Sequence, residues 1–182
     1  MILAITITGK DRPGIIRALS GALYQTGGNL EDASMTILEG EFAMIFLAAL
    51  KSASATRTLR KQLVKIERSL GLVISVKEVK HRLIRGEKHR SGTNPCVVSV
   101  LGKDRAGIVY HVSKLLADHG LNITDLNSKI MGSGRKTAYA LVLEVDIPKQ
   151  SKFVSRLKRE FETLQKKLGV TITLSFLDSI HF

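Results

Sequence analysis

The pattern of apolar and polar positions predicts the same succession of elements in each half of the chain. In the first half, alternation over residues 2–8 predicts a strand, and apolar residues at every third or fourth position over 15–23 predict a helix. Gly27-Gly28 ends this helix, because glycine accepts a left-handed backbone. Alternation over 33–37 predicts a second strand, and the apolar run 42–50 predicts a third.

A turn, a second helix and a fourth strand complete that half. Glu39-Gly40-Glu41 predicts the turn between the second and third strands. Apolar residues at helical spacing between 59 and 70 predict the second helix, and residues 72–79 predict the fourth strand. The second half shows the same order and ends in a strand at 170–176. Each half therefore reads βαββαβ.

This order predicts an α+β fold made of two tandem ferredoxin-like domains. Each would hold a four-stranded antiparallel sheet with two amphipathic helices on one face. The opposite face carries mixed residues, among them Ala4, Thr6, Ile45 and Leu47. We expect the other half of the chain or a second chain to cover it, which makes a homodimer our expectation.

A gapless internal repeat supports the two-domain reading. Residues 5–37 align with 98–130 at a constant offset of 93, and 43–50 pair with 138–145 after a two-residue insertion. The polar, basic segment between the halves ends in Asn-Pro. The predicted organisation is a first domain at 1–79, a basic linker at 80–95 and a second domain at 96–182.

Charge is unevenly distributed. The 182 residues carry a formal net charge of +12, and the segment 51–90 holds most of the excess. A basic surface of this kind attracts nucleic acid, acidic partners or anionic small molecules. A solvated helix face followed by a basic linker gives the same pattern, and the residues favour this interpretation.

The N-terminal residues and the hydropathy pattern predict the cellular location of the protein and whether it contacts a membrane. No apolar run approaches the roughly 20 residues that span a bilayer. Residues 1–6 lack a basic leader region and already alternate like a strand, so we expect no signal peptide, no membrane contact and a cytoplasmic protein. The single cysteine, Cys96, excludes an internal disulfide and a multi-cysteine zinc site, and we expect it to be buried.

The sequence argues against an enzyme. No His-x-x-x-His, His-Glu-x-x-His or Gly-x-Ser-x-Gly motif is present, and Cys96 has no adjacent histidine. We therefore predict no catalytic residue, no metal and no cofactor. The histidines are scattered along the chain at His81, His89, His111, His119 and His181.

RNA-recognition domains share the βαββαβ order, and the net charge suits RNA. They stack bases on aromatic side chains of the sheet, but residues 2–8 hold none and the third strand of the second half offers only Tyr139. Residues 40–46 echo the RNA-binding pattern only loosely. This argues against direct nucleic-acid binding and leaves non-specific phosphate attraction to 51–90 open.

The junction between the first strand and the first helix is the most informative segment. In Gly9-Lys10-Asp11-Arg12-Pro13-Gly14, Asp11 is a predicted N-cap, and Pro13 suits the first helical turn. Gly14 leaves the helix N-terminus open to an incoming carboxylate. The pattern fits a simple capped turn equally well, and its recurrence at 102–107 favours a shared structural need at least as much as a ligand site.

A second loop precedes the second strand of each half, with Asn29 and Asn122 at matching positions. Their amides could hold the ammonium and carboxylate groups of an amino acid. A turn asparagine that bonds its own backbone is the alternative, and the residues alone favour it.

At these two loops both halves resemble ACT domains, and the chain as a whole is similar to tandem-ACT regulators of the glycine cleavage system repressor type. The resemblance implies an amino-acid sensor whose modules pair and hold ligand at the pairing interface. The ligand-binding residues that it implies are Asp11, Arg12, Gly14, Ile15, Asn29, Asp104, Arg105, Gly107, Ile108 and Asn122. The second copy departs from the pattern at Ala106 and Leu121, which suggests that one site is degenerate.

A similar module leads formyltetrahydrofolate deformylases, whose catalytic domain would have to follow Phe182. We therefore expect a non-enzymatic regulatory protein that binds a small molecule, an amino acid in the first instance, and acts on a protein partner in transcriptional regulation. The alternative is a basic adaptor or nucleic-acid-associated protein that uses the fold as a scaffold.

Overall fold

The computed structural model describes residues 1–80, 89, 92–132 and 137–177. The chain divides into two compact units, 1–83 and 84–182. Most of the predicted linker lies outside the described residues. Its last three residues, 93–95, belong to the first strand of the second unit, so this strand begins earlier than the predicted domain does.

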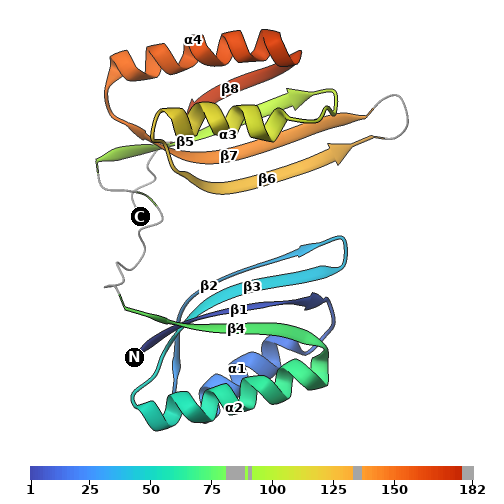
Figure 1. Cartoon of the computed structure of the whole chain (residues 1–182), viewed down its shortest axis with the longest axis vertical. Helices are drawn as coiled ribbons and strands as arrows, with labels where there is room; N and C mark the ends of the chain where they lie inside the picture. The colour runs from blue at the N-terminus through green and yellow to red at the C-terminus, as the bar shows by residue number, and fades with distance from the viewer. Residues whose placement is uncertain (81–88, 90–91, 133–136, 178–182) are drawn as a thin grey trace. The chain divides into compact units, whose positions relative to one another are not determined.

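The first unit is a four-stranded antiparallel sheet with two helices packed on one face (Figure 1). The strand order is β2-β3-β1-β4, which leaves β2 and β4 at the edges. Its elements are β1 (Ile2–Lys10), α1 (Ile15–Gln25), β2 (Asn29–Leu38), β3 (Glu41–Ala49), α2 (Ala53–Leu70) and β4 (Leu72–Val79).

The second unit repeats this architecture with the order β6-β7-β5-β8. The predicted α+β class with two ferredoxin-like βαββαβ domains is therefore confirmed. Its elements are β5 (Thr93–Gly102), α3 (Ile108–Asp118), β6 (Ile123–Met131), β7 (Ala138–Pro148), α4 (Ser151–Leu168) and β8 (Val170–Phe176).

Alternation along the central strands decides which side chains form the core. Leu3, Ile5 and Ile7 of β1 point toward the helices and are fully buried. Thr6 lies between them on the opposite face and pairs with Ile45 of β3, which is about half exposed. The two faces of the sheet thus differ as period-two patterning requires.

The strand registers correct the predicted alignment of the third strands. Thr8 pairs with Ala43, whereas its repeat counterpart Leu101 pairs with Ala140. The third strands are therefore related by four inserted residues, and the predicted two-residue insertion is wrong. An alignment that slips by two residues keeps every apolar side chain on the same face, so hydropathy could not detect the error.

Cys96 is buried in the second core, as expected. Burial raises the pKa of its thiol to about 11, with a further contribution from the negative charge of Asp146. Within the described residues, no helix is long and apolar enough to span a membrane.

Candidate functional site: the strand–helix loops

Helix α1 begins at a glycine in the left-handed region. Gly14 is the N-cap residue with φ 96°, and no side chain caps the helix. The prediction that Asp11 is the N-cap is therefore wrong, and Pro13 lies before the helix instead of in its first turn. The backbone N–H of Asp11 donates instead to the carbonyl oxygen of Gly40, at 2.8 Å. The loop is thus tied to the turn between β2 and β3.

The second unit builds the same loop. Gly107 is the N-cap of α3 with φ 94° and no side-chain cap, although Ala106 replaces the proline found in the first unit. Both helix N-termini therefore expose backbone N–H groups at the positive end of the helix dipole. This arrangement suits a carboxylate and depends on the glycine conformation, not on the preceding residue.

Arginine side chains of these loops lie near the ends of the longer helices. A Cβ added to Gly71, which ends α2, would lie 3.9 Å from Nη2 of Arg12, and one added to Gly169, which ends α4, would lie 3.5 Å from Nη1 of Arg105. A guanidinium at a helix C-terminus is favourable because the dipole is negative there. The side chains of Arg12 and Arg105 therefore lie where the charge of each favours the approach of its loop to a helix C-terminus.

Ile15 and Ile108 follow the N-cap glycines and turn inward. Both are only 2% exposed and belong to the cores of their units. Although the resemblance implied ligand contact for both residues, their side chains serve as anchors of the helix start. Asp11 and Asp104 are exposed.

Asn29 lies at the opposite end of α1 from Gly14. The helix between them has 11 residues, a length of about 16 Å. Asn29 pairs with Ala49, and its Nδ2 donates to Oε1 of Glu31 at 3.1 Å. Asn122 is placed in the same way after α3, and its carbonyl oxygen accepts from the backbone N–H of Asp146. Within one unit, the fold brings 11–15 together and leaves the asparagine apart.

The sequence predicts that Gly71 and Gly169 end the longer helices, but it does not predict that an arginine of the first loop lies near each of them. Gly71 and Gly169 have φ 63° and 65°. Their match across the repeat was visible in the sequence, but the contact with the first loop is not, because about 60 residues separate the partners.

Some ion pairs of the described residues lie on the helices of the second unit, away from the loops, and others join His89 to Glu144 and Asp146 of β7, at 3.7 and 2.7 Å. Nζ of Lys114 lies 2.6 Å from Asp118, and Glu160 lies 2.7 Å from His119 and 2.9 Å from Arg156. The hydrogen bond from His119, followed by that from Arg156, lowers the pKa of the Glu160 carboxyl. No three His, Cys, Asp or Glu side chains of the described part are grouped as a metal site.

Comparison with known proteins places both units in one family. Residues 1–77 and 97–162 each match a family model for the ACT domain. The UPF0237 protein of Pyrobaculum aerophilum is 40% identical over 86 residues, which are 47% of this chain and 91% of that protein. The UPF0237 protein of Methanocaldococcus jannaschii is 38% identical over the same shares.

Two solved structures match nearly the whole chain. A protein of unknown function from Galdieria sulphuraria has 25% identity and a TM-score of 0.79, covering 97% of this chain and 98% of its own. A protein named as a glycine cleavage system transcriptional repressor has 21% identity and a TM-score of 0.70, with 98% of each chain covered. The second likeness shows the fold alone.

The chain belongs to the ACT-domain family and carries two ACT domains in tandem. Membership of this family supports a regulatory role that involves small-molecule binding, and it favours a non-catalytic protein.

Proposed function

We propose that this protein is a non-enzymatic sensor that binds a free amino acid and passes the signal to a protein partner in the transcriptional control of amino-acid metabolism. The observation that carries the proposal is the pair of exposed helix N-termini at Gly14 and Gly107, neither of which is capped by a side chain. The carboxylate of the ligand would accept from these N–H groups. The name of the structural neighbour adds the transcriptional setting.

A complete site requires a second copy of the chain, because Asn29 lies a full helix length from Gly14. Strand β2 is an edge strand and is exposed along nearly its whole length. Asn29 begins this strand, and Gly40 follows its other end, where the Asp11 loop is attached. If β2 strands of two copies pair antiparallel, Asn29 of one copy meets the Asp11 loop of the other.

In this arrangement the protein contacts both charged groups of the ligand. The helix N-terminus receives the carboxylate, while the carboxylate of Asp11 and the amide of Asn29 receive the ammonium group. A ligand held by both copies binds the paired state better than the separate one. It therefore shifts the population toward the pair, and the partner responds to that shift.

A thermal-shift screen against the twenty amino acids tests the proposal. A ligand that binds only the native state stabilises it by about 2.7 kcal/mol at a hundred times its Kd. We expect one amino acid, or a few related ones, to raise Tm in the wild type. Asn29→Ala or Asn122→Ala should abolish the shift and so identify the working module. The absence of any shift in a folded wild-type protein would refute amino-acid sensing.

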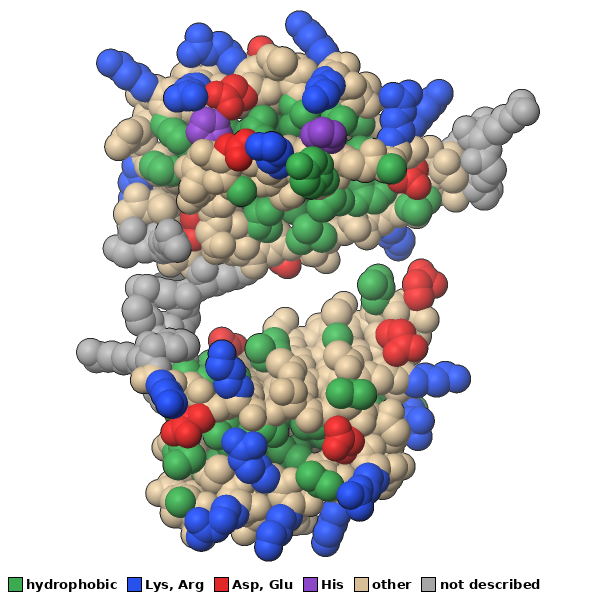
Figure 2. Space-filling model, viewed as in Figure 1, with side chains coloured by type: hydrophobic (Ala, Val, Ile, Leu, Met, Phe, Trp, Pro, Cys, Tyr) green, Lys and Arg blue, Asp and Glu red, His purple; other side chains and the backbone are tan. Residues whose placement is uncertain are grey.

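The second candidate function is a basic adaptor or nucleic-acid-associated protein. The observation that favours it is the surface of α2, which carries five exposed basic side chains. Figure 2 shows Lys and Arg side chains gathered over the helix layer of the first unit. Saturable binding of an oligonucleotide, together with no response to amino acids, would favour this function.

A further inference from the structure

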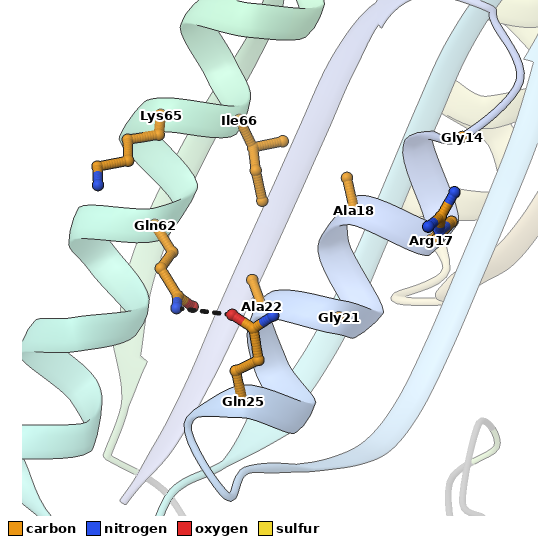
Figure 3. A pocket seen from close by; sticks show the side chains of 9 residues that line it. All are labelled: Gly14, Arg17, Ala18, Gly21, Ala22, Gln25, Gln62, Lys65 and Ile66. Atoms are coloured by element: carbon orange, nitrogen blue, oxygen red, sulfur yellow. Dashed lines mark hydrogen bonds between the residues drawn. The ribbon is translucent and has the colours of Figure 1, made fainter.

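An open groove of about 640 Å³ runs between α1 and α2 of the first unit (Figure 3). Gln62, Lys65 and Ile66 line it from α2. The α1 side is a single stripe at helical spacing, formed by Gly14, Arg17, Ala18, Gly21, Ala22 and Gln25. This stripe spans the whole helix, about 16 Å.

The groove exists because the α1 side chains along it are small. Ala18, Gly21 and Ala22 fill little of the space between the two helices, and a Cβ added to Gly21 would have no atom within 4 Å. In the second unit the same three positions hold His111, Lys114 and Leu115, and the corresponding groove has less than half the volume, about 300 Å³. These three lining residues are the repeat counterparts at the constant offset of 93.

The two grooves also differ in charge. The groove of the second unit contains Asp118 and Glu160, which are paired with Lys114 and His119. Their counterparts in the first unit are the neutral Gln25 and Gln62, hydrogen-bonded to each other at 3.1 Å. Since the lining of the first groove holds two cations and no acid, it carries an uncompensated positive charge.

The surrounding helix surface extends this charge. Lys61 and Arg68 lie one turn to either side of Lys65 and are exposed. The single acid of the two helices is Glu67, and its Oε1 accepts from the backbone N–H of Ile74 at 2.9 Å. On the groove wall, Oε1 of Gln62 is buried and has no hydrogen-bond partner within the described residues.

We propose that this groove is the docking site for an acidic amphipathic α-helix of a protein partner. An apolar helix face fits a groove three turns long, and small floor residues let the two backbones approach. Acidic side chains of the partner would meet Arg17 and Lys65 at the rims. Tyr24, which is 85% exposed, follows Gly21 on the same side of α1, and Tyr and Arg are residue types that dominate binding energy at interfaces.

A small molecule fits this groove less well, because such ligands bury most of their surface in enclosed pockets. Tyr24 is the single aromatic side chain of α1 and α2, which argues against a row of stacked bases. The proposal deepens the proposed function, on which its regulatory meaning rests, because it names the class of partner and the surface that receives it. Peptide docking is measured without amino acid, so each proposal can fail without the other.

The test is fluorescence anisotropy with a fluorescein-labelled peptide of Leu, Ala and Glu, about 18 residues or roughly 27 Å when helical. Leu stands at every third or fourth position, and Glu flanks this stripe. One control peptide carries Lys in place of Glu, and the other carries Gln in place of Leu. We expect saturable binding of the acidic amphipathic peptide by the full chain and at least tenfold weaker binding of both controls.

Two variants locate the binding. Gly21→Leu fills the groove in open space and places a better helix former in α1, so the fold is retained while affinity falls at least tenfold. The double variant Arg17→Glu, Lys65→Glu should bind the Glu peptide more weakly and the Lys peptide more tightly than the wild type does. The matched control, Lys114→Leu at the position equivalent to Gly21 in the second unit, leaves affinity unchanged.

Three results would overturn the proposal. The first is that the acidic peptide shows no saturable binding. The second is that it binds the wild type and Gly21→Leu equally. The third is that a single-stranded oligonucleotide binds more tightly than the peptide and loses affinity in the Arg17→Glu, Lys65→Glu variant, which would assign the surface to nucleic acid.

Discussion

The backbone N–H of Asp11 donates a 2.8 Å hydrogen bond to the carbonyl oxygen of Gly40. It joins the loop that begins α1 to the turn that ends the edge strand β2. A ligand held at the loop therefore acts on the same end of β2 at which a second copy would pair. This contact gives the proposed sensor a direct link between ligand binding and the association of two copies.

If two copies pair through β2, the protein is a dimer, and charged side chains introduced on this strand should dissociate it. Met35 and Ile37 lie on the helix side of β2 and are 47% and 51% exposed. We expect Met35→Lys with Ile37→Lys to give a monomer in size-exclusion chromatography with light scattering, because like charges would face each other across the pair. Val64→Lys, at an exposed apolar site on α2, should remain dimeric. A wild-type monomer would contradict the pairing.

Gly14 and Gly21 form a matched pair for testing the left-handed N-cap. A Cβ finds open space at both positions, but only Gly14 has a positive φ. Gly14→Ala should therefore lower the free energy of unfolding by about 1–2 kcal/mol. Gly21→Ala should raise it by about 0.5–1 kcal/mol, since it removes a glycine from a helix interior. Urea denaturation measures both, and equal effects of the two substitutions would contradict the N-cap geometry.

Arg12 is expected to contribute to stability through the C-terminus of α2. Removal of its charge in Arg12→Gln should cost about 0.3–1 kcal/mol, because a cation is lost from the negative end of the helix dipole. Arg17→Gln removes a charge near the N-terminus of α1, in the groove and away from the C-terminus of a helix, and should change the free energy of unfolding by less. Denaturant titrations measure both changes. Equal free energies of unfolding for the two variants would show that Arg12 does not stabilise the C-terminus of α2.

Sequence periodicity predicted the order of elements and the ends of the fourth strands, because burial on one face forces alternation in strands and a 3.6-residue repeat in helices. It could not place the start of α1, since a left-handed Gly14 and a side-chain cap at Asp11 satisfy the same residue pattern. It could not show that a whole helix separates Asn29 from Gly14. The groove was also out of reach, because it depends on small residues of α1 facing α2.

Glu160 predicts a pH dependence of stability. Hydrogen bonds from His119 and Arg156 lower the pKa of its carboxyl in the folded protein below the value in the unfolded chain. The stabilisation is therefore present above the unfolded pKa of about 4.3 and is lost as the pH falls through the lower folded pKa. Glu160→Gln should flatten this part of the stability profile, measured as Tm between neutral and acidic pH. Glu162→Gln, on the same helix, should leave it unchanged.

In the proposed sensor one ligand site is completed by two copies of the chain, and mixed dimers distinguish this arrangement from a site within one copy. Both variants also carry Asn122→Ala, which removes amino-acid binding by the second module. In this background, Asp11→Ala and Asn29→Ala should each abolish amino-acid binding by the first module. When the two variants are co-expressed, each mixed dimer regains one intact site, and titration calorimetry should detect restored binding at reduced stoichiometry. Binding that stays absent in the mixed dimers, or that survives in either variant alone, would rule out a site shared between two copies.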